Sequence, residues 1–213
     1  MSHRMRGRHS DFFTKVGWNR GWGWDTIRFM VRRIRIVYTV NNSPLGYLLL
    51  VATQKGICAV RFGKDKKKLE RELKKEFEAA QFLKNGKPLR QWNQALIHYL
   101  AGHTVWPLLP YDVEATAFQR RVWDWLRTIP PGETYHYSEA AKAIGQPTAA
   151  RAVARACATN PAALVIPCHR IVPKSGGVGG YRWHSDRKQE LLKLEKVNAA
   201  GLKPARPRGG KAL

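Results

Sequence analysis

The stretch NPAALVIPCHRIVPKSGGVGGYRW, residues 160–183, joins a short apolar run to a cysteine and then to a glycine-rich loop. Pro167 restricts the residue before it to extended geometry, so we expect the apolar run to be strand-like and Cys168 to lie on a fixed turn just after it. His169 and Arg170 create an electropositive setting, which is expected to lower the pKa of the thiol. The alternative is that Cys168 is a small buried hydrophobic residue, the usual role of a cysteine.

The segment after this cysteine adds two further candidates. Residues 175–180, SGGVGG, lack the Lys-Ser/Thr pair of a phosphate-binding P-loop, and their glycines suit a backbone that approaches a flat ligand closely. In the next predicted helix, Glu195 follows Leu191 by four residues and Leu192 by three, which places its carboxylate on the apolar stripe. A carboxylate there needs a partner. The alternative is an exposed glutamate paired with neighbouring lysines.

The first half of the chain has the pattern of a small α+β domain, residues 31–113. Period-two apolar alternation predicts a strand at residues 34–40, and two apolar runs separated by turns predict strands at residues 47–52 and 57–62. Apolar residues that recur every three to four positions predict two helices, around residues 69–77 and 92–100. We therefore expect a three-stranded antiparallel sheet and two helices.

Residues 114–199 are predicted to be mostly helical. Apolar spacing and helix breakers place helices at about residues 118–126, 138–144 and 149–158. The last two are joined by a turn that contains Gly145, which makes them a helix-turn-helix candidate, although two packed helices of an ordinary bundle would show the same pattern. On the second of these helices, Arg151 and Arg155 lie opposite the apolar face.

The charge of the chain indicates a polyanionic partner. Its 213 residues contain 38 Lys and Arg against 15 Asp and Glu, a formal net charge of +23. Residues 1–30 and residues 200–213 are disproportionately basic, and we expect both to be disordered extensions. Met30 directly precedes the first regular pattern, so we hypothesise that translation begins there. Charge alone does not decide between nucleic acid and an anionic membrane surface.

Composition excludes several classes of protein. No apolar run approaches the roughly 20 residues of a membrane span, and the N-terminus lacks the apolar segment of a signal peptide. The cysteines are three in number and include no CxxC pair, which argues against a disulfide framework. We therefore expect a protein of the reducing cytoplasm.

The quoted stretch resembles the active-site region of the O6-alkylguanine-DNA alkyltransferases, in particular the C-terminal half of the bacterial adaptive-response protein. Pro167-Cys168-His169-Arg170 carries the resemblance together with Asn160-Pro161 before it and Gly179-Gly180-Tyr181-Arg182-Trp183 after it. Further matching segments are residues 43–46, 116–119, 132–134 and 150–153. The resemblance covers roughly residues 34–198 and leaves the two basic ends outside.

The resemblance implies a two-domain protein, with a ribonuclease H-like N-terminal domain and a helical C-terminal domain that carries the helix-turn-helix. It implies repair of double-stranded DNA by direct reversal. The alkyl group of O6-methylguanine, and of O4-methylthymine, would pass irreversibly to Cys168 after the base has flipped out of the duplex. Such a protein acts once, as a monomer and without a cofactor.

The resemblance also implies a catalytic set. Cys168 would be the nucleophile, His169 the base that deprotonates it through a water, and Glu195 the group that orients and charge-balances His169. Tyr137 would assist flipping and donate a proton to the leaving guanine, while Asn160 would brace the turn before the active site.

Binding residues follow from the same resemblance. Arg151 would fill the space left in the duplex, and we add Arg155, one helical turn later, as a phosphate contact. The flipped base would meet Pro167, Ile171, Gly179, Gly180, Tyr181 and Arg182. No metal is expected, because the zinc of some family members uses N-terminal cysteines and this chain has only Cys58 there. Residues 1–33 contain no cysteine, so we expect neither phosphotriester repair nor its transcriptional role.

Three rival functions would fit part of the sequence. A non-catalytic lesion-binding relative would have replaced Cys168. A helix-turn-helix regulator would suit the charge but leave Cys168, His169 and Glu195 unexplained. A cysteine hydrolase would need a directly hydrogen-bonded Cys–His pair, which neighbours in sequence provide poorly.

Overall fold

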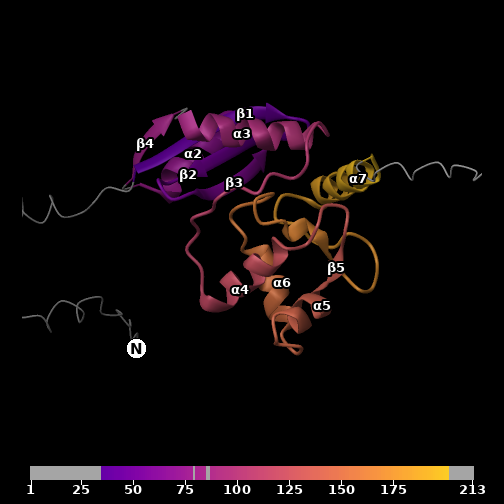
Figure 1. The fold of residues 1–213 in the computed structure, drawn as a ribbon. Helices are drawn as coiled ribbons and strands as arrows, with labels where there is room; N and C mark the ends of the chain where they lie inside the picture. The colour runs from indigo at the N-terminus through magenta and orange to yellow at the C-terminus, as the bar shows by residue number, and fades with distance from the viewer. Residues whose placement is uncertain (1–34, 79, 85–86, 202–213) are drawn as a thin grey trace, which may run out of the picture. The chain divides into compact units, whose positions relative to one another are not determined.

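The computed structural model describes residues 35–78, 80–84 and 87–201, all within one compact unit (Figure 1). The predictions for residues 1–30, for Met30 and for the tail beyond residue 201 lie outside the described residues. Within the described ranges, no helix is both long enough and apolar enough to cross a membrane.

Four strands form one sheet in the N-terminal half. They are β1 (Arg35–Ser43), β2 (Gly46–Ala52), β3 (Ile57–Gly63) and β4 (Gln81–Lys84), in the spatial order β3-β2-β1-β4. The first three pair antiparallel, as the predicted strands and their short turns indicated, with Thr39 opposite Leu50 and Leu50 opposite Val60. The β1–β2 turn uses Gly46 at φ +99°, a conformation that favours glycine.

The prediction of a three-stranded sheet is wrong, because β4 adds a fourth strand that pairs parallel with β1. This strand has only four residues, and all but the half-buried Phe82 are exposed. A strand so short and so exposed carries no measurable alternation of apolar residues, so the sequence pattern does not reveal it.

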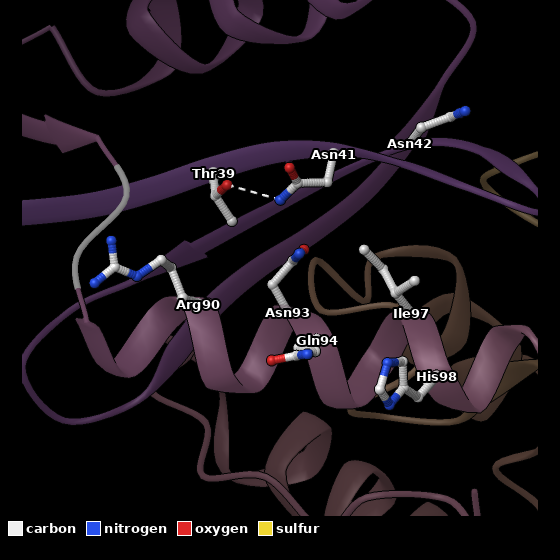
Figure 2. A pocket seen from close by; sticks show the side chains of 8 residues that line it. All are labelled: Thr39, Asn41, Asn42, Arg90, Asn93, Gln94, Ile97 and His98. Atoms are coloured by element: carbon white, nitrogen blue, oxygen red, sulfur yellow. Dashed lines mark hydrogen bonds between the residues drawn. The ribbon is translucent and has the colours of Figure 1, made fainter. Parts of the chain in front are cut away.

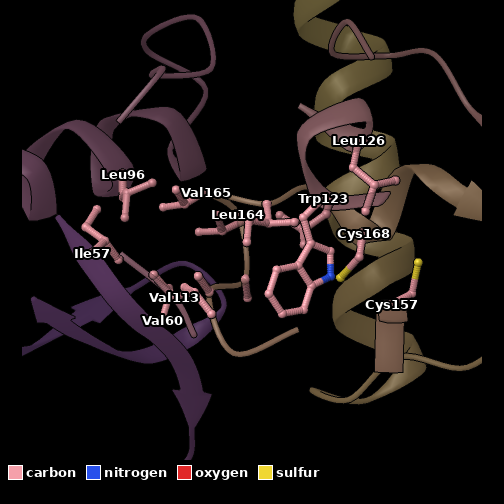
Figure 3. Packing of buried hydrophobic residues seen from close by; sticks show 14 of the residues in the cluster. Ile57, Val60, Leu96, Val113, Trp123, Leu126, Cys157, Leu164, Val165 and Cys168 are labelled. Atoms are coloured by element: carbon pink, nitrogen blue, oxygen red, sulfur yellow. The ribbon is translucent and has the colours of Figure 1, made fainter. Parts of the chain in front are cut away.

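Two helices pack on the sheet, α2 (Lys66–Glu76) and α3 (Lys87–Leu100). The alternation of the strands divides their side chains between two apolar clusters. Leu49 packs with Leu73 of α2 in one cluster, whereas Leu50 packs with Leu96 of α3 in the other. The second cluster continues into the C-terminal half and includes Cys168 (Figure 3).

The C-terminal half is mostly helical, as predicted. Its elements are α4 (Ala117–Leu126), β5 (Tyr135–His136), α5 (Tyr137–Ala143), α6 (Ala150–Ala158), the 3-10 helix η1 (Cys168–Arg170), β6 (Ile171–Val172) and α7 (Ser185–Gly201). Thr116 caps α4: its hydroxyl oxygen accepts from the Gln119 backbone N–H, and its own backbone N–H donates to the Gln119 side chain. The two-residue strands β5 and β6 pair in parallel, and this pairing holds the start of α5 beside the end of η1.

The apolar run before Pro167 is not a strand, contrary to prediction. It folds as successive turns, in which Leu164 has φ +69° and its carbonyl accepts a hydrogen bond from the Trp106 indole at 2.8 Å. A single bridge between Val60 and Ala162 ties it to β3. Its side chains are buried against the sheet domain (Figure 3). Burial explains why the run is apolar, while the left-handed backbone of Leu164 prevents an extended strand.

Candidate active site

Cys168 is the first residue of η1, and only 6% of its surface is exposed. Its backbone N–H donates to the carbonyl of Ile166 at 2.8 Å. The side-chain amide of Asn160 donates to the same carbonyl at 2.8 Å and to Cys168 Sγ at 3.1 Å, and its Oδ1 accepts from the Ala162 N–H at 2.9 Å. Asn160 thus binds both the turn and the thiol.

The expected depression of the thiol pKa is wrong. Burial raises the pKa of Cys168 and outweighs the lowering effects of the Asn160 hydrogen bond and the positive charge of Lys188. The side chains of His169 and Arg170 bond instead to Glu195, so they do not form the electropositive contact that the sequence suggested. His169 and Arg170 follow Cys168 in sequence, but their side chains bond to Glu195 and not to the thiol.

Glu195 receives hydrogen bonds from four groups and is fully buried. Its Oε1 lies 2.8 Å from His169 Nε2 and 2.9 Å from Arg170 Nη2, and it also accepts from the Tyr99 hydroxyl. Its Oε2 accepts from Arg170 Nε at 3.1 Å and from the Gly132 N–H at 3.2 Å. The carboxylate on the apolar stripe therefore has partners, and the alternative of an exposed, lysine-paired glutamate is wrong.

The charges of this cluster fix its protonation. Burial alone would raise the pKa of Glu195, but the charges and hydrogen bonds of His169 and Arg170 outweigh burial and lower it. Burial lowers the pKa of His169, against the opposing attraction of Glu195. The pair thus favours an ionised carboxylate beside a neutral imidazole, with the permanent charge of Arg170 neutralising Glu195.

The second imidazole nitrogen of His169, Nδ1, is buried and has no hydrogen-bond partner among the described residues. With Nε2 donating to Glu195, Nδ1 carries the free lone pair of a neutral imidazole. A buried lone pair without a partner is costly, and it is the atom through which His169 can accept a proton.

Two tyrosines lie near the thiol. Tyr137, at the start of α5, is half-buried, and burial together with the neighbouring Cys157 and Cys168 raises its pKa. The Tyr181 hydroxyl is buried and has no hydrogen-bond partner in the described part of the chain. Burial raises the pKa of Tyr181 well above its ordinary value, with Cys168 again contributing. Both hydroxyls remain protonated and can donate.

Lys188 is a residue that the sequence interpretation missed. It is buried, and its ammonium donates to the carbonyls of Ile171 at 2.6 Å and Gly180 at 3.4 Å. Burial lowers its pKa, and the nearby thiol of Cys168 opposes this effect. Lys188 lies seven residues before Glu195, on the same stripe of α7, so the spacing that singled out Glu195 could also have found it.

Steric crowding explains one glycine of the glycine-rich loop, an explanation that the sequence interpretation did not supply. Gly179 has φ +69°, and a Cβ at this position would lie 2.6 Å from Pro173 Cγ. Of the other expected binding residues, Pro167 and Ile171 are buried beside Cys168 and His169, whereas Gly180 and Arg182 are exposed. The tight packing of Gly179 against Pro173 and the hydrogen bond from Lys188 to the Gly180 carbonyl therefore hold the loop in place.

Comparison with known proteins assigns both halves of the chain to one family. Residues 36–109 match the ribonuclease-like domain of 6-O-methylguanine DNA methyltransferase, and residues 117–197 match its DNA-binding domain. A methylated-DNA–protein-cysteine methyltransferase of Methanosarcina acetivorans is 40% identical over 162 residues, which cover 74% of this chain and 97% of that protein. The chain belongs to the 6-O-methylguanine DNA methyltransferase family.

Similarity to other members of this methyltransferase family supports the same assignment. The bifunctional transcriptional activator/DNA repair enzyme Ada of Escherichia coli is 39% identical over 189 residues, which cover 89% of this chain but 53% of Ada. The chain thus spans about half the length of that relative. The crystal structure of the Mycobacterium tuberculosis O6-methylguanine methyltransferase matches with a TM-score of 0.66 at 34% identity, covering 80% of this chain and 96% of that one. The two-domain arrangement, with a sheet domain followed by a helical domain, is confirmed.

The two arginines predicted to contact DNA lie on one exposed surface of this family member. Arg151 and Arg155 of α6 line a hollow of about 510 Å³ whose opposite wall is the start of α4, with Phe118 and Gln119. No carboxylate lines it. The arrangement leaves two guanidinium groups free to meet an anion beside an apolar floor.

A second hollow, of about 550 Å³, lies in the sheet domain and shares no residue with the predicted site (Figure 2). It is lined by polar side chains of β1, including Thr39 and Asn41, and by one side of α3, including Arg90 and Asn93. Within the described ranges, no three His, Cys, Asp or Glu side chains lie close enough together to hold a metal ion.

Proposed function

We propose that the protein repairs double-stranded DNA by transferring the alkyl group of O6-alkylguanine, and of O4-alkylthymine, to its own Cys168 in a single turnover. The observation that carries this proposal is the buried Cys168 thiol beside the His169–Glu195–Arg170 cluster, within a chain that belongs to the methyltransferase family.

The proposed step begins with deprotonation of the thiol. His169 Nδ1 has a free lone pair and accepts the Cys168 proton through a water, because adjacent side chains on one turn do not bond directly. Glu195, held ionised by Arg170, stabilises the imidazolium that forms. The raised pKa of Cys168 keeps the resting thiol protonated, so its proton must pass to His169 before or during attack.

The transfer itself is a displacement at carbon. A Cys168 Sγ–carbon bond forms as the bond from that carbon to O6 breaks, and its electron pair passes to guanine. Tyr137, whose raised pKa keeps its hydroxyl protonated, donates a proton to the leaving base, and the proton held by His169 replaces it through solvent. The product thioether is not cleaved, so each protein acts once.

The base must leave the stacked duplex to reach a buried thiol. We propose that α5 and α6 act as a helix-turn-helix, with Arg151 filling the vacated space and Arg155 on a phosphate. Pro167, Ile171, Gly179, Gly180, Tyr181 and Arg182 would then surround the flipped base. The exposed guanidinium groups and the apolar floor between α4 and α6 support this docking.

The remaining features of the proposal concern the whole chain. We propose a ribonuclease H-like topology for the sheet domain, a monomeric protein that needs no cofactor, and the cytoplasm as its compartment. The three cysteines are free in the described part of the chain, which suits a reducing environment where a nucleophilic thiol persists.

The function is tested with a duplex that carries one O6-methylguanine in a restriction site. Wild-type protein should restore cleavage of at most one site per molecule, and Cys168→Ala should restore none while still binding the duplex. Repair of several sites per molecule would contradict a suicide reaction. Sustained hydrolysis of a small ester would indicate the rival cysteine hydrolase.

A further inference from the structure

The active-site carboxylate is held from two domains. Three of the donors to Glu195 belong to the helical domain: His169 and Arg170 of η1 and the backbone N–H of Gly132. The fourth is the hydroxyl of Tyr99, which lies on α3 of the sheet domain, 96 residues away in sequence. A group outside the DNA-binding domain therefore contacts the cluster behind the thiol.

Tyr99 is well placed for a fixed contact. Only 1% of its surface is exposed, and its ring packs in the apolar cluster that also contains Leu96 and Cys168. Burial, together with the charge of Glu195, raises the pKa of Tyr99, so its hydroxyl stays protonated and acts as a donor. Its hydrogen bond goes to Oε1, the same oxygen that bonds to His169 Nε2.

We propose that Tyr99 is a positioning residue of the transfer reaction, through which the sheet domain fixes Glu195 Oε1 and limits the pull of this oxygen on the His169 imidazole. The inference rests on the proposed function and extends it to the sheet domain. Tyr99, His169 and Arg170 all bond to Oε1, and donors on one oxygen share its negative charge. Loss of the Tyr99 hydroxyl leaves Oε1 a stronger acceptor for His169, which stabilises the imidazolium.

The other charged groups around Glu195 and His169 are the same residues in the wild type and in a Tyr99 variant. Arg170 contacts Glu195 from η1, Lys188 acts on His169 from α7, and the neutral Tyr181 hydroxyl lies nearby in the loop before α7. The Tyr99 hydroxyl interacts with Arg170 and Tyr181 as well as with Glu195, but a change at Tyr99 replaces none of these charged or polar groups. A shift in the titration of His169 therefore reports the loss of the Tyr99 hydroxyl.

The test measures the rate of single-turnover methyl transfer from O6-methylguanine duplex between about pH 5.5 and 9. Tyr99→Phe retains the ring and removes the hydroxyl. We expect its acid limb, where His169 becomes protonated, to move to higher pH by about half a unit, and its plateau rate to fall about threefold to tenfold. Replacing Tyr99 by 3-fluorotyrosine, which keeps the shape and donates more strongly, should move the limb to lower pH.

The matched control is Tyr111→Phe, which removes another tyrosine–carboxylate hydrogen bond, to Asp124, away from the thiol. It should leave the pH profile unchanged. If neither change at Tyr99 moves the acid limb while the wild type transfers its methyl group, the inference is overturned and the proposed function stands. If Tyr99→Phe does not fold, the 3-fluorotyrosine protein decides alone. If the wild type transfers nothing, both are overturned.

Discussion

The three cysteines of the described residues differ in their neighbours more than in their burial. Burial raises the pKa of Cys58 to about 11, and it also raises the pKa of Cys157. Cys168 is buried as well, but its sulfur accepts a hydrogen bond from Asn160 and lies near the ammonium of Lys188. Lys188 acts on Cys157 as well, so the side-chain hydrogen bond from Asn160 is what distinguishes the Cys168 thiol among the three.

Asn160→Ala tests this contact at the level of one side chain. The change removes the amide bonds to Ile166 and Cys168 and leaves the N–H of Ala162 buried without its acceptor. We expect unfolding free energy to fall by about 2 kcal/mol and transfer to slow. Asn42→Ala, at an exposed position of β1, is the control. Urea unfolding and single-turnover rates give the answer; unchanged transfer would show that the thiol does not depend on Asn160.

Glu195→Gln tests the buried charge. Removing the carboxylate leaves Arg170 uncompensated, so we expect a loss of about 3–5 kcal/mol at neutral pH. Because the pKa of Glu195 is lowered from its ordinary 4.5, its stabilisation is complete above that pH and is lost as the pH falls below it. The wild-type advantage over the variant should therefore shrink on acidification.

Glu190→Gln is the matched control, since Glu190 is an exposed residue of the same helix, paired only with Lys193. This variant should show nearly wild-type stability at neutral pH, as measured by urea unfolding. A wild-type advantage over Glu195→Gln that stayed constant down to pH 3 would contradict the assigned ionisation.

Glu195 and Cys168 show which properties of single side chains could be predicted from the sequence. That Glu195 needs a partner was predictable, because a carboxylate on an apolar stripe has few ways to be stabilised, whereas His169 as that partner came from the family resemblance. The direction of the Cys168 pKa was not, because burial depends on packing from distant segments. Roles for the individual site residues remain predictions.

Among the elements, α6 has the simplest relation between sequence and function. Val153, Ala156 and Cys157 are buried on one side, while Arg151 and Arg155 are exposed on the other. Periodic elements such as this helix and the first three strands were predictable. β4, β5 and β6 were not, because two to four residues carry no period, and the turns before Pro167 depend on the backbone of Leu164.

Arg155→Ala should weaken binding to all duplex sequences alike and reduce the slope of log affinity against log salt by about one. The reason is that one phosphate contact, and the counterion it releases, is lost. Arg71→Ala on α2 removes an exposed arginine of the sheet domain and should leave the slope unchanged. Fluorescence anisotropy at several salt concentrations measures both. An equal slope for Arg155→Ala and wild type would remove Arg155 from the interface.

At the scale of the whole molecule, the sheet domain and the helical domain share one apolar cluster. The Val60–Ala162 bridge, the Trp106 indole on the Leu164 carbonyl and the Arg187 guanidinium on the Leu45 carbonyl add polar contacts between them. The sequence divided the chain near residue 113 but contained no sign of these contacts, because each joins residues far apart along the chain.

Because the two domains share one apolar cluster, we expect them to unfold together in a single transition. Val60→Ala removes two methyl groups from a fully buried position of β3 and should lower the unfolding free energy by about 2 kcal/mol. Tryptophan fluorescence and far-ultraviolet circular dichroism should report one coincident transition before and after the change. Val197→Ala, at an exposed position of α7, should have little effect. Two separated transitions in the wild type would show that the halves fold independently.

The central claim is that Cys168 accepts the alkyl group. Its most direct test is the intact mass of the protein, with peptide mapping, after incubation with duplex DNA containing one O6-methylguanine. We predict a gain of one CH₂, at most once per molecule, on the peptide that contains Cys168. Tight binding to the lesion with no gain in mass would contradict the account and leave a protein that recognises the damaged base without repairing it.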